Sequence, residues 1–341
     1  MAPAFPGIRD RRSALRFGRR RALQVTAAAG VVLALLLWWL LPLGQASSPR
    51  GRVDFTTGVP TGVYARYGAL LKQHVARDLP DVDLRLRSSE GSVQNIERLV
   101  SGKASFTIAT ADAVAAYRER GGRDADRLRA CARLYDDYMQ LVVPAGSDVR
   151  SAADLRGKRV AIGQKGSGVS LIAGRLLGAA GLDARKDIEP VRVGIDRMPG
   201  LLREGKIDAF FWSGGLPTAA VSDLADDVGI RLVQLGDLSD ELTRQGAATR
   251  HYRAAVMPAD AYPQVQHGKA VRTVAVANLL VTTDRTDPGL TEGITRTVID
   301  SRDRIGSEVH AAQLVDLRTA IFTDPLELHE GARRYYRSVK S

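Results

Sequence analysis

The chain of 341 residues can bury one large or two medium-sized cores, and 45% hydrophobic with 26% charged residues is typical of a globular protein. Its net charge of +11 is uneven, because residues 1–21 contribute +6 and the other residues +5. A basic tip on a mildly basic body lacks the basic stripe with aromatic residues that nucleic-acid binding needs, so nucleic acid is excluded as a partner.

An uncharged, largely apolar segment follows the basic tip, from Ala22 to Pro49. Its centre, VVLALLLWWLLPLG, is long enough to span a membrane, and the arginines before it favour a cytoplasmic N-terminus. We therefore predict a basic cytoplasmic tip at 1–21, a transmembrane anchor at 22–45 and a linker at 46–51. The alternative is a cleaved signal peptide, because Gly44-Gln45-Ala46 resembles a cleavage site. In both cases the body lies outside the cytoplasm, tethered to the cell membrane or released into the periplasm.

The body begins with alternating strands and helices. In chain order the patterns predict a strand at 53–56, a helix at 63–75, a strand at 82–86, a helix at 92–101, a strand at 105–109, a helix capped by Asp112 and a strand at 138–143. The only cysteine, Cys131, cannot form an intrachain disulfide and is expected to be buried.

The same alternation continues to the end of the chain. We predict strands at 158–163, 191–193, 207–212, 230–235, 252–257 and 273–282, and helices at 169–180, around 201–202, at 218–226, from Pro288 and from Pro325. Alternating strands and helices imply parallel βαβ units. A helix end followed by Gly-Lys and an apolar strand occurs twice, at 99–106 and at 202–209. The repeat favours two similar α/β lobes over a single sheet.

Tests for catalytic and cofactor motifs are negative. The stretch 163–170 has no Gly-Lys-Ser/Thr, and Gly166-Ser167-Gly168 lacks the third glycine of a dinucleotide fingerprint. The five histidines lack metal-ligand spacing, and no G-x-S-x-G occurs. Asp136 and Asp137 are adjacent, so we interpret them as solvated rather than as an acid pair. The sequence therefore predicts no catalytic residue, metal or cofactor, and a receptor rather than an enzyme.

Three Gly/Ser/Thr-rich loops each follow a strand and precede a helix: 57–62, 88–92 and 166–168. In an open α/β sheet such loops face a crevice at the carboxyl ends of the strands. Helix N-termini favour anions, so the loop at 166–168 could take a phosphate, a carboxylate or nothing. If the three loops converge, they could hold a small carboxylate without an arginine.

The segments that carry a family resemblance are TTGVPTGVYARYGALL (56–71), SSEGSVQNIERLVSGKASFTIATADA (88–113), DLRGKRVAIGQKGSG (154–168), GKIDAFFWSGGLPTAAVSDLA (205–225), TVAVANLLVT (273–282) and PLELHEGARRYY (325–336). With them the chain resembles the TAXI class of solute-binding proteins of TRAP transporters. DLRGKRVAIG alone is less specific, because it also occurs in binding proteins of ATP-driven importers.

The resemblance implies an α/β, two-lobed periplasmic binding protein fold (type II-like), each lobe a mixed sheet flanked by helices. Lobe 1 would comprise 52–140 and 253–341, and lobe 2 would comprise 141–252, with crossings near 140–142 and 252–255. It also implies capture of a small carboxylate such as glutamate or 2-oxoglutarate by a monomer, and delivery to TRAP membrane subunits. A ligand-binding sensor and an ABC-type binding protein remain alternatives.

The resemblance also implies a set of ligand-binding residues. They are Gly58, Thr61, Gly62 and Tyr64 in the first loop, Ser88, Gly91, Ser92, Val93 and Asn95 in the second, Thr110 and Asp112 after the next strand, Gly166, Ser167 and Gly168 in the third loop, and Trp212, Gly215 and Pro217 in lobe 2. Two positions depart from the family pattern. Val169 stands where a threonine usually follows Gly-Ser-Gly, and Val63 precedes Tyr64 where a paired aromatic is common.

Overall fold

The computed structural model describes residues 24, 27, 30–32, 48–246 and 249–340. Contacts divide the chain into two compact units, Met1–Ser47 and Ser48–Ser341. The predicted basic tip lies outside the described residues, as does most of the predicted anchor. Within the described part of the chain, no helix has both the length and the apolar character needed to cross a membrane. The features below all belong to the second unit.

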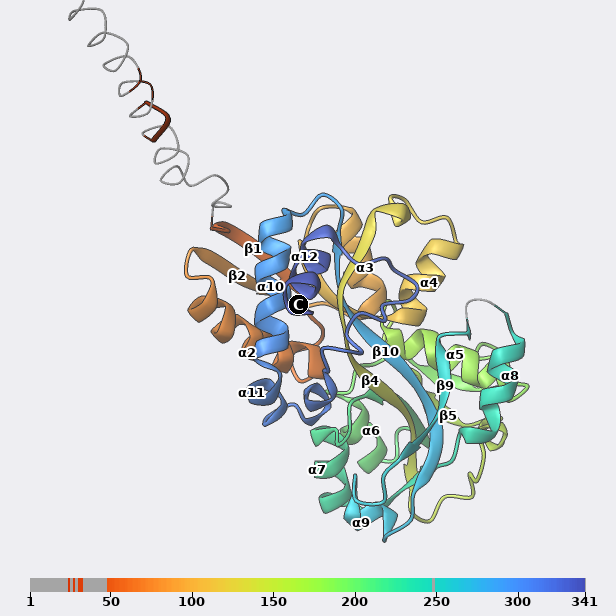
Figure 1. Ribbon diagram of the computed structural model, residues 1–341. Helices are drawn as coiled ribbons and strands as arrows, with labels where there is room; N and C mark the ends of the chain where they lie inside the picture. Colours follow the sequence, from red (N-terminus) through yellow and green to blue (C-terminus); the bar gives the residue numbers. More distant parts are fainter. Residues whose placement is uncertain (1–23, 25–26, 28–29, 33–47, 247–248, 341) are drawn as a thin grey trace, which may run out of the picture. The chain divides into compact units, whose positions relative to one another are not determined.

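The second unit is built on one sheet (Figure 1). Its strands are β1 (Gly51–Thr56), β2 (Val82–Arg87), β3 (Phe106–Thr110), β4 (Leu128–Pro144), β5 (Arg159–Ala161), β6 (Glu189–Val191), β7 (Ala209–Gly214), β8 (Ile230–Val233), β9 (Tyr252–Met257) and β10 (Val271–Thr283). The order is β2-β1-β3-β10-β4-β7-β5-β6, with β8 on β4 and β9 on β10. The strand pairing is continuous, so the two lobes share one sheet instead of having separate ones.

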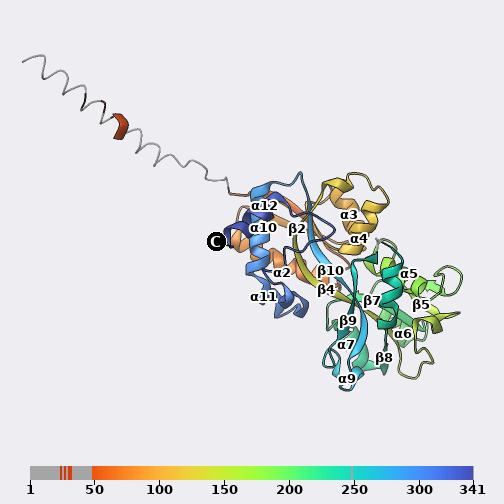
Figure 2. The same cartoon turned by 45° about the vertical axis from the view of Figure 1, so that its right-hand side comes forward.

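Helices cover both faces of the sheet (Figure 2). They are α2 (Val63–Asp78), α3 (Ser92–Val100), α4 (Ala111–Glu119), α5 (Gly168–Ala179), α6 (Met198–Arg203), α7 (Ala219–Asp227), α8 (Ser239–Arg244), α9 (Pro263–Gln266), α10 (Pro288–Asp300), α11 (Arg302–Gly306) and α12 (Glu330–Ser338). Short 3-10 turns lie at 125–127, 152–155, 236–238 and 310–314. The mixed α/β, two-lobed architecture predicted from the sequence is confirmed.

Each lobe contains the predicted parallel units. In the first, β1 pairs in parallel with β2 and β3, and α2 and α3 make the connections. In the second, β5 pairs in parallel with β6 and β7. Because parallel strands all end at the same edge, the loops after β1, β3 and β5 point toward one end of their lobe.

The two long strands β4 and β10 join the lobes. They pair antiparallel from Leu128–Thr283 to Tyr138–Ala275 and run side by side through both lobes (Figure 1). β9 pairs with the first half of β10, from Tyr252–Val276 to Met257–Val271. We therefore propose that the second crossing lies within β10, which makes lobe 1 residues 52–140 and 277–341 and lobe 2 residues 141–276.

Two sequence predictions at element ends differ from the structure. The last helix begins at Glu330 rather than Pro325, because residues 327–329 run along β4. There the Ala130 N–H donates to Glu327 O (2.9 Å), and the His329 N–H donates to Ala130 O (2.8 Å). The cap of α4 is Thr110, and Asp112 lies inside the first turn. Cys131 is buried, as expected.

Candidate functional site

The three predicted loops meet where the lobes face each other. The loop before α3 contacts the loop before α5: the Gln94 N–H donates to Gly166 O (3.1 Å), and Gln164 Nε2 donates to Glu90 O (3.3 Å). At Gly91, φ is +122°, and an added Cβ would lie 3.3 Å from Ser167 Cα. Only glycine fits this conformation and this approach without strain. The lobes are therefore in direct contact on this side of the cleft.

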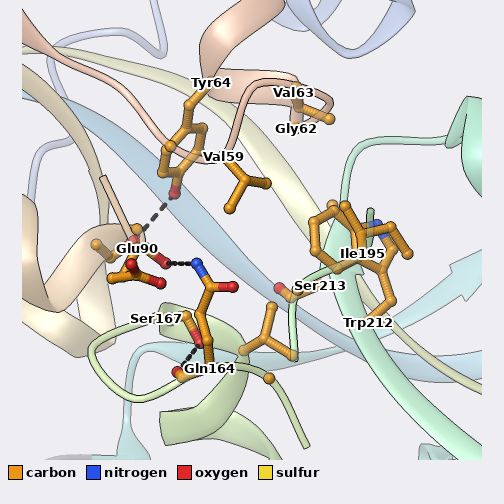
Figure 3. A pocket seen from close by; sticks show the side chains of 18 of the residues that line it. Val59, Gly62, Val63, Tyr64, Glu90, Gln164, Ser167, Ile195, Trp212 and Ser213 are labelled. Carbon is orange, nitrogen blue, oxygen red and sulfur yellow. Dashed lines mark hydrogen bonds between the residues drawn. The ribbon is translucent and has the colours of Figure 1, made fainter. Parts of the chain in front are cut away.

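A cavity of about 70 Å³ lies beside this contact, with walls from both lobes (Figure 3). Val59 and Tyr64 enter it from lobe 1, and Gln164, Ile195 and Trp212 enter it from lobe 2. A binding pocket for a drug-sized molecule measures roughly 300–1,000 Å³, so this cavity suits a small ligand. A second cavity of about 470 Å³ lies between α2, the start of α7 and residues 308–311.

The structure brings most of the predicted site residues to these two cavities. Lining the small cavity are Gly58, Gly62, Tyr64, Gly91, Ser92, Thr110, Ser167, Gly168 and Trp212. The larger cavity is lined by Thr61, Gly215 and Pro217, together with Gly62 and Trp212. Five predicted residues line neither: Ser88, Val93, Asn95, Asp112 and Gly166. The convergence of the loops is confirmed, whereas ligand binding by these residues stays a prediction.

Asn95 is fully buried and holds lobe 1 together. Its amide nitrogen donates to Thr57 O (2.6 Å) and Ile108 O (3.1 Å), and its oxygen accepts from the hydroxyls of Thr56 (2.8 Å) and Ser89 (2.6 Å). Buried amides need such partners, and here they fix the loop before α3 to β1 and β3. Asn95 therefore supports the site from behind.

Asp112 links the lobes outside the small cavity. Tyr252 OH donates to Asp112 Oδ2 (2.6 Å), Arg175 Nη1 donates to Tyr252 OH (2.9 Å), and the same nitrogen lies 3.8 Å from Asp112 Oδ2. The Arg175 guanidinium also lies over the Tyr252 ring, at 5.5 Å. This group joins α4 in lobe 1 to α5 and β9 in lobe 2, so it stabilises the arrangement in which the lobes touch.

A chain of hydrogen bonds fixes the lobe 1 wall. Tyr64 OH donates to Asn278 Oδ1 and lies 3.1 Å from Ser92 Oγ, which accepts from the Thr110 N–H (3.2 Å). Burial and then nearby Asp137 raise the pKa of Tyr64 well above its ordinary value. The phenol is therefore a neutral hydrogen-bonding group at physiological pH.

Ser167 and Trp212 each have a structural partner. Ser167 Oγ caps α5 by accepting from the Ser170 N–H (3.0 Å), and it donates to Gln164 O (2.7 Å). Trp212 is 8% exposed, belongs to the larger core cluster and donates from Nε1 to Thr218 Oγ1 (3.0 Å). Both residues hold the lobe 2 wall in shape.

The interpretation of Asp136 and Asp137 as solvated is wrong, because both are buried in β4. Adjacent strand residues point to opposite faces. Asp136 pairs with Arg133 (2.7 Å) and Arg253, and although burial raises its pKa, these two arginines lower it overall. Asp137 lines the small cavity instead. The strand was predicted to begin at Tyr138. Extending it backwards through Asp136 and Asp137 would have placed one of the two carboxylates on the face of the sheet that borders the cavity.

Burial raises the pKa of Asp137 to about 7, with Asp136 and Asp112 raising it further and Asn278 and Ser213 opposing the rise.

Other lining residues that the sequence did not single out as site residues are Val59, Val63, Glu90, Gly163, Gln164, Val169, Gly194, Ile195, Met198, Ser213 and Gly214. Among the described residues, no group of three His, Cys, Asp or Glu side chains could hold a metal ion.

Four helices begin at the cavity. The residues at the N-termini of α2, α3, α4 and α5 that line it are Gly62, Gly91, Thr110 and Ser167. The helices have 16, 9, 9 and 12 residues, and only α5 has a side-chain cap. Helix N-termini carry a partial positive charge. Together they favour the negative end of a ligand.

The sequence profile of the NMT1-like family matches residues 55–339. The chain belongs to the NMT1-like family. The match includes both lobes and every residue that lines the small cavity.

Similar solved structures share the architecture at low sequence identity. A protein from Bordetella bronchiseptica RB50 is 16% identical with a TM-score of 0.54, and the match covers 86% of this chain and 99% of that one. The periplasmic aliphatic sulphonate binding protein SsuA from Escherichia coli is 16% identical, with 85% and 84% covered and a TM-score of 0.47. An ancestral arginine-binding protein bound to arginine is 16% identical, with 76% and 98% covered and a TM-score of 0.49. The described residues 48–246 and 249–340 have the two-lobed periplasmic binding protein fold.

Proposed function

We propose that this protein is an extracytoplasmic solute-binding receptor that captures a small carboxylate between its two lobes. The observation that carries the proposal is the small cavity, which has walls from both lobes and is closed on one side by the hydrogen bonds between residues 90–94 and 164–166. Four helix N-termini at the cavity suit a carboxylate without an arginine.

Ligand release would require the lobes to separate. The two strands that cross between the lobes, β4 and β10, form the natural hinge, because few other covalent connections would have to bend. Opening would break the contacts of Gln94 and Gln164 and the group formed by Asp112, Arg175 and Tyr252. The structure thus corresponds to the closed form of the receptor in this proposal.

The partner that receives the solute follows from the family resemblance. The segments at 56–71, 88–113 and 205–225 resemble TAXI proteins, so we assign delivery to the membrane subunits of a TRAP transporter. Genes for such subunits beside this one, and co-purification with them, are the expected findings. Genes for an ATP-driven importer there would favour the ABC-type alternative, and a signalling kinase would favour a sensor.

The location outside the cytoplasm rests on the apolar segment at 22–45 and the arginines before it. We propose that this segment tethers the receptor to the cell membrane. Mass spectrometry of the protein purified from membranes should find the N-terminal region intact, and processing after Ala46 would show a released periplasmic protein instead.

A thermal-shift screen of the full chain with amino acids, 2-oxo acids and dicarboxylates tests the receptor function. At least one small carboxylate should raise the melting temperature, because a ligand that binds only the folded state stabilises it. The ligand should be recovered unchanged. Recovery of a reaction product, or a screen in which no small molecule binds, would contradict the proposal.

A further inference from the structure

Asp137 lines the small cavity with the Asn278 side-chain amide close to its carboxyl group, and one of its oxygens is left without a well-formed hydrogen bond. The side chain is 5% exposed, and Oδ1 has no hydrogen-bond partner among the described residues. Oδ2 accepts a long hydrogen bond from Ser213 Oγ (3.4 Å). A buried carboxylate oxygen with nothing bound to it is costly, so it is suited to a ligand that donates to it.

The described wall of the cavity contains acidic side chains but no basic side chain. Glu90 lies in the wall together with Asp137, and no lysine, arginine or histidine occurs among the described residues that line it. A ligand with only negative charge would be repelled by an ionised Asp137 in this poorly hydrated site. A ligand that also carries an ammonium group would instead be attracted.

The opposite charge of the ligand has its own place in the same cavity. The N-termini of α2, α3 and α4 reach the wall without side-chain caps. Thr110 Oγ1, which is buried, also has no hydrogen-bond partner among the described residues and can donate to an anion. The site therefore offers a neighbouring acceptor for a cation and donors for an anion, as the adjacent ammonium and carboxylate groups of an amino acid require.

The remaining wall limits the size of the ligand. Val59, Ile195 and Trp212 give the cavity an apolar side, and its volume is about 70 Å³ (Figure 3). A short hydrocarbon body would bury its surface there, whereas a second charged group would find no counter-charge.

We propose that the cavity selects small zwitterions, with the ammonium group bound to Asp137, the carboxylate at the N-termini of the helices and a short apolar body against Trp212. The inference rests on the proposed function and narrows its ligand from any small carboxylate to short amino acids such as glycine and alanine. A 2-oxo acid lacks the ammonium group that Asp137 requires.

The pH dependence of binding separates this ligand class from a simple carboxylate. The charged and titratable groups that influence Asp137 are Tyr64, Asp112, Tyr135 and Asp136, with Glu90 in the same wall. Arg175 compensates Asp112, and Arg133 and Arg253 compensate Asp136, so none of these cations is available to Asp137. Because burial raises the pKa of Asp137 to about 7, its charge changes near neutral pH.

An ammonium group binds the ionised form of Asp137, so affinity for a zwitterion should rise from pH 6 to pH 8, by about tenfold for a pKa near neutrality. A carboxylate that needs the protonated form would show the opposite trend. The two trends have opposite signs, so either result is decisive.

Calorimetry of the full chain with two ligand pairs is the test. L-lactate carries a hydroxyl where L-alanine carries an ammonium group, and 2-oxoglutarate carries a keto group where L-glutamate carries an ammonium group. L-alanine should bind, and L-lactate should bind about 30-fold more weakly or not at all, because its neutral hydroxyl cannot compensate the charge of the buried carboxylate. L-glutamate should bind more weakly than L-alanine, because its second carboxylate has no counter-charge.

Two variants make the same chemical change on opposite faces of β4. Asp137→Asn should weaken L-alanine binding about 30-fold or more. Asp136→Asn removes a carboxylate on the opposite face of β4 and outside the cavity wall, so it should change the affinity for L-alanine far less than Asp137→Asn does.

Equal binding of L-alanine and L-lactate, or affinity that rises as the pH falls, would overturn the inference and leave the receptor function intact. Absence of binding by all four compounds would also overturn it. In that case the broader thermal-shift screen decides whether the receptor function fails as well. The comparison of ligands on the unmodified protein stays decisive even if Asp137→Asn does not fold.

Discussion

The two walls of the small cavity differ in chemistry. The lobe 1 wall holds the buried polar side chains Tyr64, Ser92, Thr110 and Asp137 beside Val59 and Val63. The lobe 2 wall holds the larger apolar side chains Val169, Ile195, Met198 and Trp212 beside Gln164, Ser167 and Ser213. Tyr64, Ser92 and Thr110 are held by hydrogen bonds within lobe 1, whereas Asp137 also accepts one from Ser213 in lobe 2. If the proposed receptor function holds, we expect lobe 1 to select the ligand and lobe 2 to cover it and exclude water. Substitutions in the two walls should therefore have different effects.

The largest effect is expected for Trp212→Ala in the apolar wall. Because Trp212 belongs to the main core cluster, its removal should lower the free energy of unfolding by about 3–5 kcal/mol. Trp212→Phe keeps most of the packing and loses only the hydrogen bond to Thr218, at about 1 kcal/mol. Urea unfolding measures both. If Trp212→Ala were as stable as the parent, this wall would not be part of the core.

Asp137→Asn in the polar wall should stabilise the protein at high pH. The folded state keeps a proton to about pH 7 that the unfolded chain releases near 3.8, so ionisation of Asp137 lowers stability as pH rises between these values. Asparagine lacks this penalty, which amounts to at most about 4 kcal/mol.

Urea unfolding at pH 5 and pH 8 checks this prediction. The gain from Asp137→Asn should be larger at pH 8. Asp136→Asn is the control, because the pKa of Asp136 is lowered and its charge does not change in this range. If Asp137→Asn changed the free energy of unfolding by the same amount at pH 5 and pH 8, Asp137 would not be the group that ionises with a raised pKa.

Tyr252→Phe removes one hydroxyl from the group that joins the lobes. The loss of the hydrogen bond to Asp112 should cost about 2 kcal/mol and weaken ligand binding by favouring separated lobes. Tyr117→Phe removes an exposed hydroxyl in lobe 1 and serves as the control. Calorimetry with the best ligand from the screen gives both affinities. Unchanged binding by Tyr252→Phe would show that this group does not stabilise the closed form.

Gly91→Ala tests the contact between the loops of the two walls. The new methyl group would lie 3.3 Å from Ser167 Cα across the cleft, in a backbone conformation with φ of +122°. We expect about tenfold weaker ligand binding, equivalent to about 1.4 kcal/mol. Gly51→Ala has a comparable φ of +107° but no neighbour within 4 Å, so the difference between the variants isolates the contact across the cleft. Equal affinities would mean that the loops need not touch.

Ser167→Ala is expected to have the smallest effect on stability and binding, because the Ser167 hydroxyl already serves as the cap of α5. Loss of the cap should cost about 1 kcal/mol of stability. Ser167→Thr can keep the cap and should recover most of it. A large loss of ligand affinity with unchanged stability would instead show that Ser167 contacts the ligand directly.

The sequence predicted the parallel units and the loops because local patterns determine them. Gly62, Gly91 and Gly168 mark strand-to-helix turns, and the structure brings all three to one cavity. The pairing of β9 with β10 depends on contacts between distant segments, which local patterns do not show, and our proposal for the second crossing rests on this pairing.

The site was harder to predict than the fold. Asn95 and Asp112 have polar side chains next to the right loops, but their partners turn them toward the interior and away from the cavity. Asp137 was missed for the opposite reason, because an acidic pair is usually solvated. Only the length of β4 and the alternation of its side chains show that one acid is enclosed.

A crystal structure of the full chain with the tightest small ligand from the screen would show the proposed site itself. We expect one ligand molecule in the small cavity, with an ammonium nitrogen within hydrogen-bonding distance of Asp137 Oδ1 and a carboxylate at the N-termini of α2, α3 or α4. A ligand bound elsewhere, or one whose carboxylate contacts Asp137, would contradict the proposed mode of binding.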